Sequence, residues 1–243
     1  MEHRVSGMND YTYVGSELAL FARAHAWKSY AARLLRPHLG EEVLEVGAGI
    51  GGTTKFLCPG SQRRWLCLEP DATMAAEIKT AIASGTLPAC CQVRPATLDQ
   101  LESGECFDSI LYIDVLEHIA DDCAELANAA SLLKPGGKLI VLGPAHQWLF
   151  SPFDQAIGHF RRYSKKTLAA AAPGELICRR LCYVDAVGLL ALMGNRLLLR
   201  SRLPSSRQVW MWDRLMVPLS RLLDPLLCYR LGKSVLGIWQ KQE

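Results

Sequence analysis

The segment from Val43 to Gly52, with the sequence VLEVGAGIGG, constrains the fold of this chain more than any other feature. Its apolar first half predicts a short buried strand that ends in a carboxylate. The glycines predict a tight turn, because they tolerate positive φ and let backbone N–H groups approach a ligand closely. A helix is expected to begin near Thr53, and its N-terminus adds unpaired donors and a partial positive charge. Together these elements predict a binding site for a nucleotide-like ligand.

The charge of Glu45 narrows the choice of ligand. Gly47, Gly49 and Gly52 satisfy G-x-G-x-x-G, a pattern of dinucleotide-binding proteins. A carboxylate directly before these glycines would repel a pyrophosphate, whereas it would attract an ammonium group. S-adenosylmethionine carries an ammonium group on its methionyl end. Glu45 therefore favours S-adenosylmethionine, with an NAD(P)-dependent oxidoreductase as the alternative.

Strand-like and helix-like segments alternate after the glycine turn, which is typical of a parallel sheet with helices on both faces. Helices are predicted over 71–83, with Asp71 as the N-cap, and over 121–133, where the turn sequence KPGG at 134–137 ends the helix. We predict an α/β, Rossmann-like, seven-stranded and mostly parallel sheet. Its strands are expected near 43–46, 64–69, 91–94, 107–113, 138–142, 175–184 and 234–239.

Composition excludes several classes of function. The chain has 243 residues, of which 50% are hydrophobic and 21% charged, as in globular proteins. A net charge of +3 is too small to indicate nucleic-acid binding. The N-terminal residues lack the apolar core of a signal peptide, and the nine cysteines are an odd number, so reduced thiols and a cytoplasmic location are expected. No metal site is expected, because no four ligands have zinc spacing.

Polar residues follow several predicted strands at their carboxyl ends, where ligands of open α/β sheets bind. Glu69 ends the second strand about twenty residues beyond the glycines, where a carboxylate can accept both hydroxyls of a ribose. Thr97 and Leu98 follow the third strand and either line an adenine pocket or form an ordinary loop. The run from Asp114 to His118 is expected beneath the cofactor, with His118 either structural or functional.

Four features in order make residues 43–142 resemble the class I S-adenosylmethionine-dependent methyltransferases. They are the Glu-x-Gly-x-Gly loop, the acid Glu69, the sequence DVLEHI at 114–119 and the sequence LKPGG at 133–137. The resemblance implies a methyl-transfer activity with S-adenosylmethionine as cofactor. Glu45 and Gly47 are then expected near the methionyl group.

The resemblance also implies contacts with the rest of the cofactor. Many members carry an acid where this chain has Thr97, so adenine recognition is expected to use backbone or hydroxyl groups. Trp27 and Tyr30 of the N-terminal helix either cover the sulfonium with an aromatic face or pack in the core. The expected cofactor contacts are Trp27, Tyr30, Glu45, Gly47, Ala48, Gly49, Glu69, Pro70, Thr97, Leu98, Asp114, Val115 and His118.

Residues 144–146, 153–154 and 158–163 resemble a narrower group of bacterial methyltransferases that act on glycans or other secondary metabolites. This second resemblance identifies no single substrate. Arg161 and Arg162 either hold an acidic group of the acceptor or lie in solvent. The acceptor is therefore expected to be a small molecule or a glycan, with an acidic group as one option.

Methyl transfer from a sulfonium is an in-line displacement that needs an aligned acceptor and often a base. Histidine is the side chain closest to such a base by its ordinary pKa. His146 and His159 both follow the fifth strand, and His159 is the preferred base, with a turn-forming role as its alternative. Asp154 is expected to orient or acidify a histidine, and Tyr163 either packs in the core or contacts the acceptor.

The chain is expected to contain three parts. Residues 1–40 form an N-terminal helical extension that acts as a lid, and residues 41–187 with 232–243 form the cofactor-binding α/β domain. Residues 188–231 form a helical insertion, interpreted first as a substrate cap and otherwise as a dimer interface or a membrane-contacting surface. The predicted activity is methyl transfer to oxygen or nitrogen. A non-catalytic cofactor-binding protein is a further alternative, and the oligomeric state is open.

Overall fold

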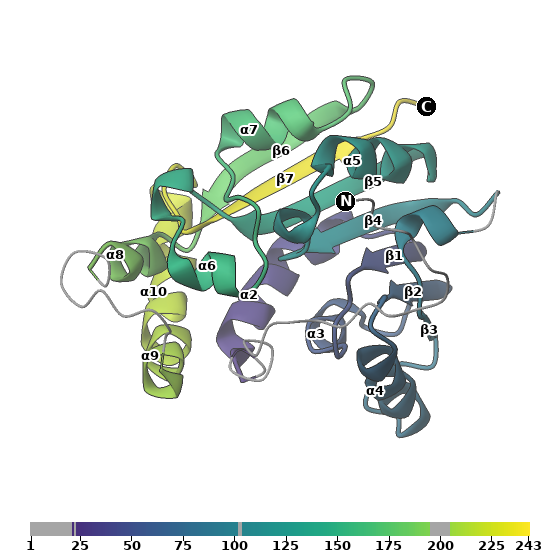
Figure 1. The fold of residues 1–243 in the computed structure, drawn as a ribbon, viewed down its shortest axis with the longest axis horizontal. Helices are drawn as coiled ribbons and strands as arrows, with labels where there is room; N and C mark the ends of the chain where they lie inside the picture. The colour runs from purple at the N-terminus through teal and green to yellow at the C-terminus, as the bar shows by residue number, and fades with distance from the viewer. Residues whose placement is uncertain (1–20, 22, 102–103, 195–204) are drawn as a thin grey trace, which may run out of the picture.

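The computed structural model describes residues 21, 23–101, 104–194 and 205–243. A seven-stranded sheet runs through its centre in the order β3-β2-β1-β4-β5-β7-β6 (Figure 1). Strand β7 is antiparallel to both of its neighbours, and the other pairs are parallel. The predicted seven-stranded, mostly parallel sheet is confirmed. The strands are β1 (Glu42–Val46), β2 (Arg64–Leu68), β3 (Cys91–Arg94), β4 (Phe107–Ile113), β5 (Leu133–Pro144), β6 (Ile177–Val184) and β7 (Ser234–Gln240).

Helices cover both faces of the sheet (Figure 1). Alternate residues of one strand point to opposite faces, so Val43 and Leu44 belong to two different apolar clusters. One cluster includes residues of α2, α3, α4 and α9, and the other includes residues of α5 and α7. The longer helices are α2 (His25–Leu35), α3 (Thr54–Leu57), α4 (Ala72–Ala83), α5 (Asp122–Ser131), α6 (Pro152–Ala156), α7 (Lys165–Ala171), α8 (Ala186–Gly194), α9 (Ser206–Met211) and α10 (Val217–Leu226).

Short turns of helix complete the fold. The 3-10 helices are η1 (Arg36–His38), η2 (Leu98–Gln100), η3 (Leu116–His118) and η4 (Gln147–Leu149). A π-helical segment, η6 (Trp212–Met216), joins α9 to α10. Helices α8, α9 and α10 all lie between β6 and β7 in the chain and gather at one end of the sheet (Figure 1). The helical insertion before the last strand is thus present.

The sequence prediction was correct for the start of α4 and wrong for the start of β5. The Asp71 carboxylate accepts hydrogen bonds from the backbone N–H groups of Thr73 and Met74, so it is the N-cap of α4 as predicted. Strand β5 begins at Leu133, whereas the prediction began at Lys138. Leu133 is buried and pairs with Phe107, so the KPGG sequence is an irregularity within the strand instead of a turn before it.

Two buried aspartates of the insertion bind the N-terminal helix α2. Asp213 accepts hydrogen bonds from the backbone N–H groups of Ala26 (3.1 Å) and Trp27 (2.8 Å). It therefore caps the start of α2, where the residue at the N-cap position supplies no side-chain cap. Asp224 accepts a hydrogen bond from the Tyr30 hydroxyl (2.6 Å). These contacts hold the insertion and α2 together as one wall of the molecule.

Asp224 also caps α8, because it accepts hydrogen bonds from the backbone N–H groups of Asp185 (2.7 Å) and Ala186 (2.9 Å). Asp185 has a positive φ of 67° and in turn accepts hydrogen bonds from Trp212 Nε1 and Ser220 Oγ. Burial raises the pKa of Asp224, and the hydrogen bonds from Tyr30 and the two backbone groups oppose that shift. The insertion is consequently organised by carboxylates whose partners come from several helices.

The Asp224→Ala variant should lower the free energy of unfolding by about 3 kcal/mol, because three buried donors lose their acceptor. Tyr30→Phe removes only one donor of the same set and should cost about 1 kcal/mol. Urea unfolding followed by circular dichroism measures both. A cost for Asp224→Ala no greater than that for Tyr30→Phe would contradict the assigned role.

Candidate functional site

A cavity of about 980 Å³ opens at the carboxyl ends of β1 and β4. Its walls come from α2, the glycine loop after β1, the segment after β4, the region around α6, and helices α8 and α9 with η6. The cavity thus lies where open α/β sheets bind ligands. Among the predicted contacts, those that line it are Trp27, Glu45, Gly47, Ala48, Gly49, Asp114, His118, Asp154 and His159.

The glycine loop has the backbone conformation that its sequence requires. Gly47, Gly49 and Gly51 have positive φ angles of 66°, 58° and 74°. A Cβ atom at Gly47 would lie 2.7 Å from a methyl group of Val115. Val115 is therefore a packing partner of the loop and is absent from the cavity lining.

Glu45 is buried beside the loop and lines the cavity. Its Oε2 accepts hydrogen bonds from Thr54 Oγ1 and Trp65 Nε1, both at 2.8 Å. Burial raises the pKa of Glu45 to about 7, although the two hydrogen bonds favour the carboxylate. Both bonds use one oxygen, so Oε1 is the atom that can accept from a ligand.

Glu69, which directly follows β2, stabilises the glycine loop. Glu69 accepts hydrogen bonds from the backbone N–H groups of Gly49 (2.7 Å) and Asp71 (3.0 Å). Burial raises the pKa of Glu69, and these two N–H groups oppose the shift. Glu69 and Pro70 are adjacent to the cavity but are not part of its lining.

The loop at Thr97 and Leu98, which was predicted either to line an adenine pocket or to be an ordinary loop, is also outside the cavity lining. Thr97 caps η2, and its hydroxyl donates to Asp99. Leu98 is buried in the apolar cluster that contains α5. The loop is therefore ordered by its own capping interactions and by packing.

The segment after β4 brings titratable groups into the cavity. Asp114 has a positive φ of 54°, and burial raises its pKa. Burial also raises the pKa of Glu117 well above its ordinary value, and the charge of Asp114 adds to this shift. Neither carboxyl oxygen of Glu117 has a hydrogen-bond partner among the described residues. Burial, with the nearby His159 ring, lowers the pKa of His118 to about 4.

His159 lies in the cavity, held by Asp154. Its Nδ1 is 3.1 Å from Asp154 Oδ1, its Nε2 is 3.8 Å from Glu117 Oε1, and its ring packs edge-on against His118 at 4.5 Å. Burial opposes ionisation of Asp154, but hydrogen bonds from His159 and Arg162 lower its pKa to about 2. An ionised Asp154 only accepts, so His159 donates from Nδ1, and in the neutral imidazole this tautomer leaves Nε2 as the acceptor.

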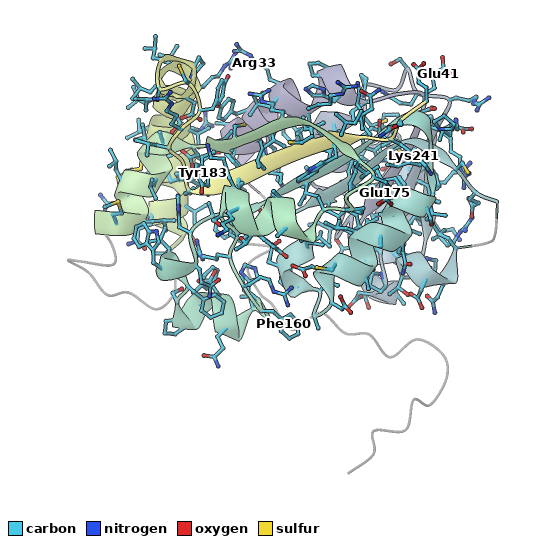
Figure 2. All side chains as sticks on the ribbon, turned by 90° about the horizontal axis from the view of Figure 1, so that it is seen from above. Arg33, Glu41, Phe160, Glu175, Tyr183 and Lys241 are labelled. Atoms are coloured by element: carbon cyan, nitrogen blue, oxygen red, sulfur yellow. The ribbon has the colours of Figure 1, made fainter. Side chains whose placement is uncertain are left out.

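Arg162 and Ser151 complete the surroundings of Asp154. Arg162 donates to Asp154 through Nε (2.9 Å) and Nη2 (2.7 Å), and Ser151 donates through its backbone N–H and its hydroxyl. Arg161 instead pairs with Asp122 at 2.7 Å. The exposed Phe160 projects outward from the loop that carries these residues (Figure 2). The two neighbouring arginines therefore have different roles.

Three further predicted site residues are not in the cavity lining. His146 donates from Nε2 to the carbonyl of Gly232 (2.9 Å) and stacks on Tyr183. Tyr163 is 2% exposed, and its hydroxyl donates to Asp122 (2.7 Å), so it belongs to the core. Tyr30 is 2% exposed and bound to Asp224. Each side chain has a polar atom engaged outside the cavity, and the burial of Tyr163 and Tyr30 agrees with the core-packing alternative for both.

Comparison with known proteins agrees with this geometry. Residues 44–139 match a family model described as a methyltransferase domain. A demethylmenaquinone methyltransferase of Tropheryma whipplei (strain Twist) is 29% identical over 163 residues, 63% of this chain and 62% of the relative. A ubiquinone biosynthesis O-methyltransferase of Rhodopseudomonas palustris (strain HaA2) is 30% identical over 112 residues, 45% of this chain and 42% of the relative.

A solved structure shares the fold. The N-methyltransferase NodS of Bradyrhizobium japonicum WM9, in complex with S-adenosyl-L-homocysteine, superposes with a TM-score of 0.57 at 15% identity, over 92% of this chain and 88% of that chain. These matches show a methyltransferase domain of the class I S-adenosylmethionine-dependent type within the chain, over residues 44–139. The cofactor of such domains is S-adenosylmethionine, as predicted. The chain spans less than two thirds of the length of both curated relatives.

Sequence reasoning missed the contact between two cavity residues, Lys233 and Trp212. Lys233 Nζ lies 4.2 Å from the centre of the Trp212 ring and 4.9 Å from that of Trp27. Burial lowers the pKa of Lys233, and the charges of Asp185 and Asp114 oppose this shift. One alternative for Trp27 was contact with the sulfonium of the cofactor. In the structure, the cation over its ring is the ammonium group of Lys233. The folded chain alone brings residues 27, 212 and 233 together, so no local pattern marks them.

Two groups of three potential metal ligands occur in the part of the chain that the structure describes. Cys58, Cys90 and Cys91 form one, and Glu117, His118 and His159 form the other, with ligand atoms within 4.8 Å of one another in each group. Only the second group lines the cavity. Neither group offers the four protein ligands of a closed structural zinc site.

The Glu45→Gln variant should bind S-adenosylhomocysteine more weakly by about 1–3 kcal/mol, because a charge-assisted contact with the ligand's ammonium group is lost. Because the pKa of Glu45 is about 7, binding at pH 7 should also release about half a proton from the wild type and none from the variant. Affinity for the wild type should rise with pH through 7, as Glu45 ionises.

Titration calorimetry in phosphate and in Tris, whose ionisation enthalpies differ, measures both quantities. Equal affinity and equal proton release in the two proteins would place the ammonium group away from Glu45.

Proposed function

We propose that the chain transfers a methyl group from S-adenosylmethionine to a hydroxyl oxygen of a small, largely apolar acceptor. The observation that carries the proposal is the position of His159. Its Nδ1 is held by an ionised Asp154, and it lines the same cavity as the glycine loop and Glu45. A base and a cofactor loop in one cavity are the two requirements of this reaction.

The proposed cofactor contacts follow the ends of the strands. The methionyl ammonium group is assigned to Glu45, and the ribose hydroxyls to Glu69 beyond β2. Adenine lies toward Thr97 and Leu98, whose loop offers backbone groups and one hydroxyl. The helix after the glycine loop begins at Thr54, and Gly52 and Thr53 directly before it line the cavity. The reactive methyl group then points into the open part of the cavity.

His159 is proposed to take the proton of the acceptor hydroxyl at Nε2. Asp154 fixes the tautomer and orients the ring, so it is a positioning residue. Arg162 neutralises the charge of Asp154 and restrains its carboxylate with two hydrogen bonds. With S-adenosylmethionine bound, a C–O bond would form as the C–S bond breaks, the sulfonium would become a neutral thioether, and the positive charge would leave with the acceptor's proton, which ends on His159. The protein contributes alignment and proton removal.

The apolar walls support an apolar acceptor. The bulkier apolar residues of the cavity lining are Phe21, Trp27, Leu149, Phe150, Val209, Met211, Trp212 and Met216. The names of both curated relatives identify them as enzymes of menaquinone or ubiquinone formation. Phenols and quinols fit such walls better than glycans do, because a glycan needs many polar partners to replace water. Nitrogen acceptors remain the second option for the same base.

The match of residues 44–139 to a methyltransferase domain weighs against the oxidoreductase alternative, since such domains use S-adenosylmethionine. The alternative of a non-catalytic cofactor-binding protein is separated from the proposal by the acceptor test. That test incubates the full chain with methyl-labelled S-adenosylmethionine and three acceptor pools, namely phenols with quinols, amines, and glycans. Mass spectrometry should find the label on the phenol or quinol pool. Label on glycans alone would overturn the acceptor class, and ligand binding without any transfer would support the non-catalytic alternative.

The His159→Ala variant should lower turnover by roughly 10²–10⁴-fold, because the acceptor loses its base. The loss of turnover should be smaller for phenols of lower pKa, because these phenols ionise more readily without a base. His146→Ala is the matched control, since His146 is not in the cavity lining and should keep turnover near that of the wild type. Steady-state rates across a series of substituted phenols measure this. A deficit that is the same for every phenol would make His159 a structural residue.

A further inference from the structure

The continuous helix formed by α9, η6 and α10 exposes a row of leucines. Leu215, Leu219, Leu222 and Leu226 are separated by four, three and four residues, so they share one face. They are 56%, 51%, 68% and 77% exposed. We call this row the leucine stripe. Single exposed apolar residues are ordinary, but a contiguous row of this kind marks a contact surface.

The buried face of the same helix is on the opposite side. Val209, Asp213, Val217, Ser220 and Asp224 are buried and recur every three or four residues. Asp213 and Asp224 bind α2 and α8 through the hydrogen bonds described above. This anchoring fixes the rotation of the helix, so the leucine stripe stays directed away from the core.

Arginines follow the leucine stripe along the helix. Arg207, Arg214 and Arg221 recur every seven residues and are all exposed. The acids between residues 205 and 231 are Asp213 and Asp224, and both are buried and hydrogen-bonded. Within the described part of the insertion, the exposed charge is therefore entirely positive. An apolar row beside a basic row is the pattern of a helix that lies in a lipid interface.

We propose that this face docks on the surface of an anionic lipid bilayer, with the leucine stripe among the acyl chains and the arginines among the headgroups. Charge complementarity selects this occupant over a second copy of the chain, because an isologous contact would bring rows of arginines together. None of the helices in the described ranges is long and apolar enough to cross a membrane, so the contact is peripheral.

Docking would bring the cavity to the lipid surface. Gln208, Val209, Met211, Trp212 and Met216 belong to the same helical stretch and line the cavity. One face of this stretch thus contributes cavity wall while another meets lipid. The proposal goes beyond methyl transfer and stands independently of it, because vesicle binding needs neither cofactor nor acceptor.

The test is cosedimentation of the full chain with vesicles of phosphatidylcholine alone or of equal parts phosphatidylcholine and phosphatidylglycerol. The wild type should bind the anionic vesicles at least about tenfold more tightly, and added salt should weaken this binding. The double variant Leu222→Asp with Leu226→Asp should lose at least about tenfold in affinity. The exchange Arg214→Glu with Arg221→Glu should remove the preference for anionic vesicles.

Ile177→Asp is the control, because Ile177 is an exposed apolar residue (39%) on β6, outside this face. It should bind vesicles like the wild type, and circular dichroism should show all variants folded. Equal binding of both vesicle types, no vesicle binding by the wild type, or a leucine-stripe variant that binds like Ile177→Asp would overturn the proposal. So would a wild-type dimer in light scattering that the Leu222→Asp, Leu226→Asp variant dissociates, since the face would then be a protein interface.

Discussion

The cavity depends on buried carboxylates that must find donors. Burying an acid is costly unless its oxygens accept hydrogen bonds, so Asp185, Asp213 and Asp224 restrict how the insertion can pack. Their partners include backbone N–H groups at the starts of α2 and α8, where unpaired donors are available. Each acid therefore satisfies a helix end while joining two helices. The result is a single arrangement of α2, α8 and α10, and the wall they share closes one side of the cavity.

The donors around a buried acid also set its pKa, and they give Glu45 and Asp154 different roles in the cavity. Glu45 accepts only from neutral groups, Thr54 and Trp65, and its pKa rises to about 7. Asp154 accepts from His159 and from the cation Arg162, and its pKa falls to about 2. Glu45 can thus respond to an arriving cation by ionising, whereas Asp154 is a permanent anion suited to orienting a base. Environment, rather than residue type, makes this distinction.

Features encoded within a few residues could be predicted from the sequence, and features that need the whole fold could not. The glycine loop and the Asp71 cap are local, so they were predicted. The choice between His146 and His159 depends on partners elsewhere: Gly232 engages His146 outside the cavity, and Asp154 holds His159 inside it. Lys233 had no signal, because the rings it meets come from α2 and η6. The acceptor class depends on walls built by segments distant in sequence.

The π-helical turn at Trp212–Met216 lies where one helix contacts the cavity, helix α2 and the solvent-exposed side of the molecule. A π turn accommodates an additional residue and so shifts the faces of the helix that follow it. Trp212 lines the cavity, and Asp213 beside it caps α2, so two adjacent residues both face inward. The next two, Arg214 and Leu215, both face outward. On both sides of the turn the inward anchors keep a spacing of three or four residues, so α9 and α10 share one buried face. The same helix therefore couples the shape of the cavity to the orientation of its exposed leucines.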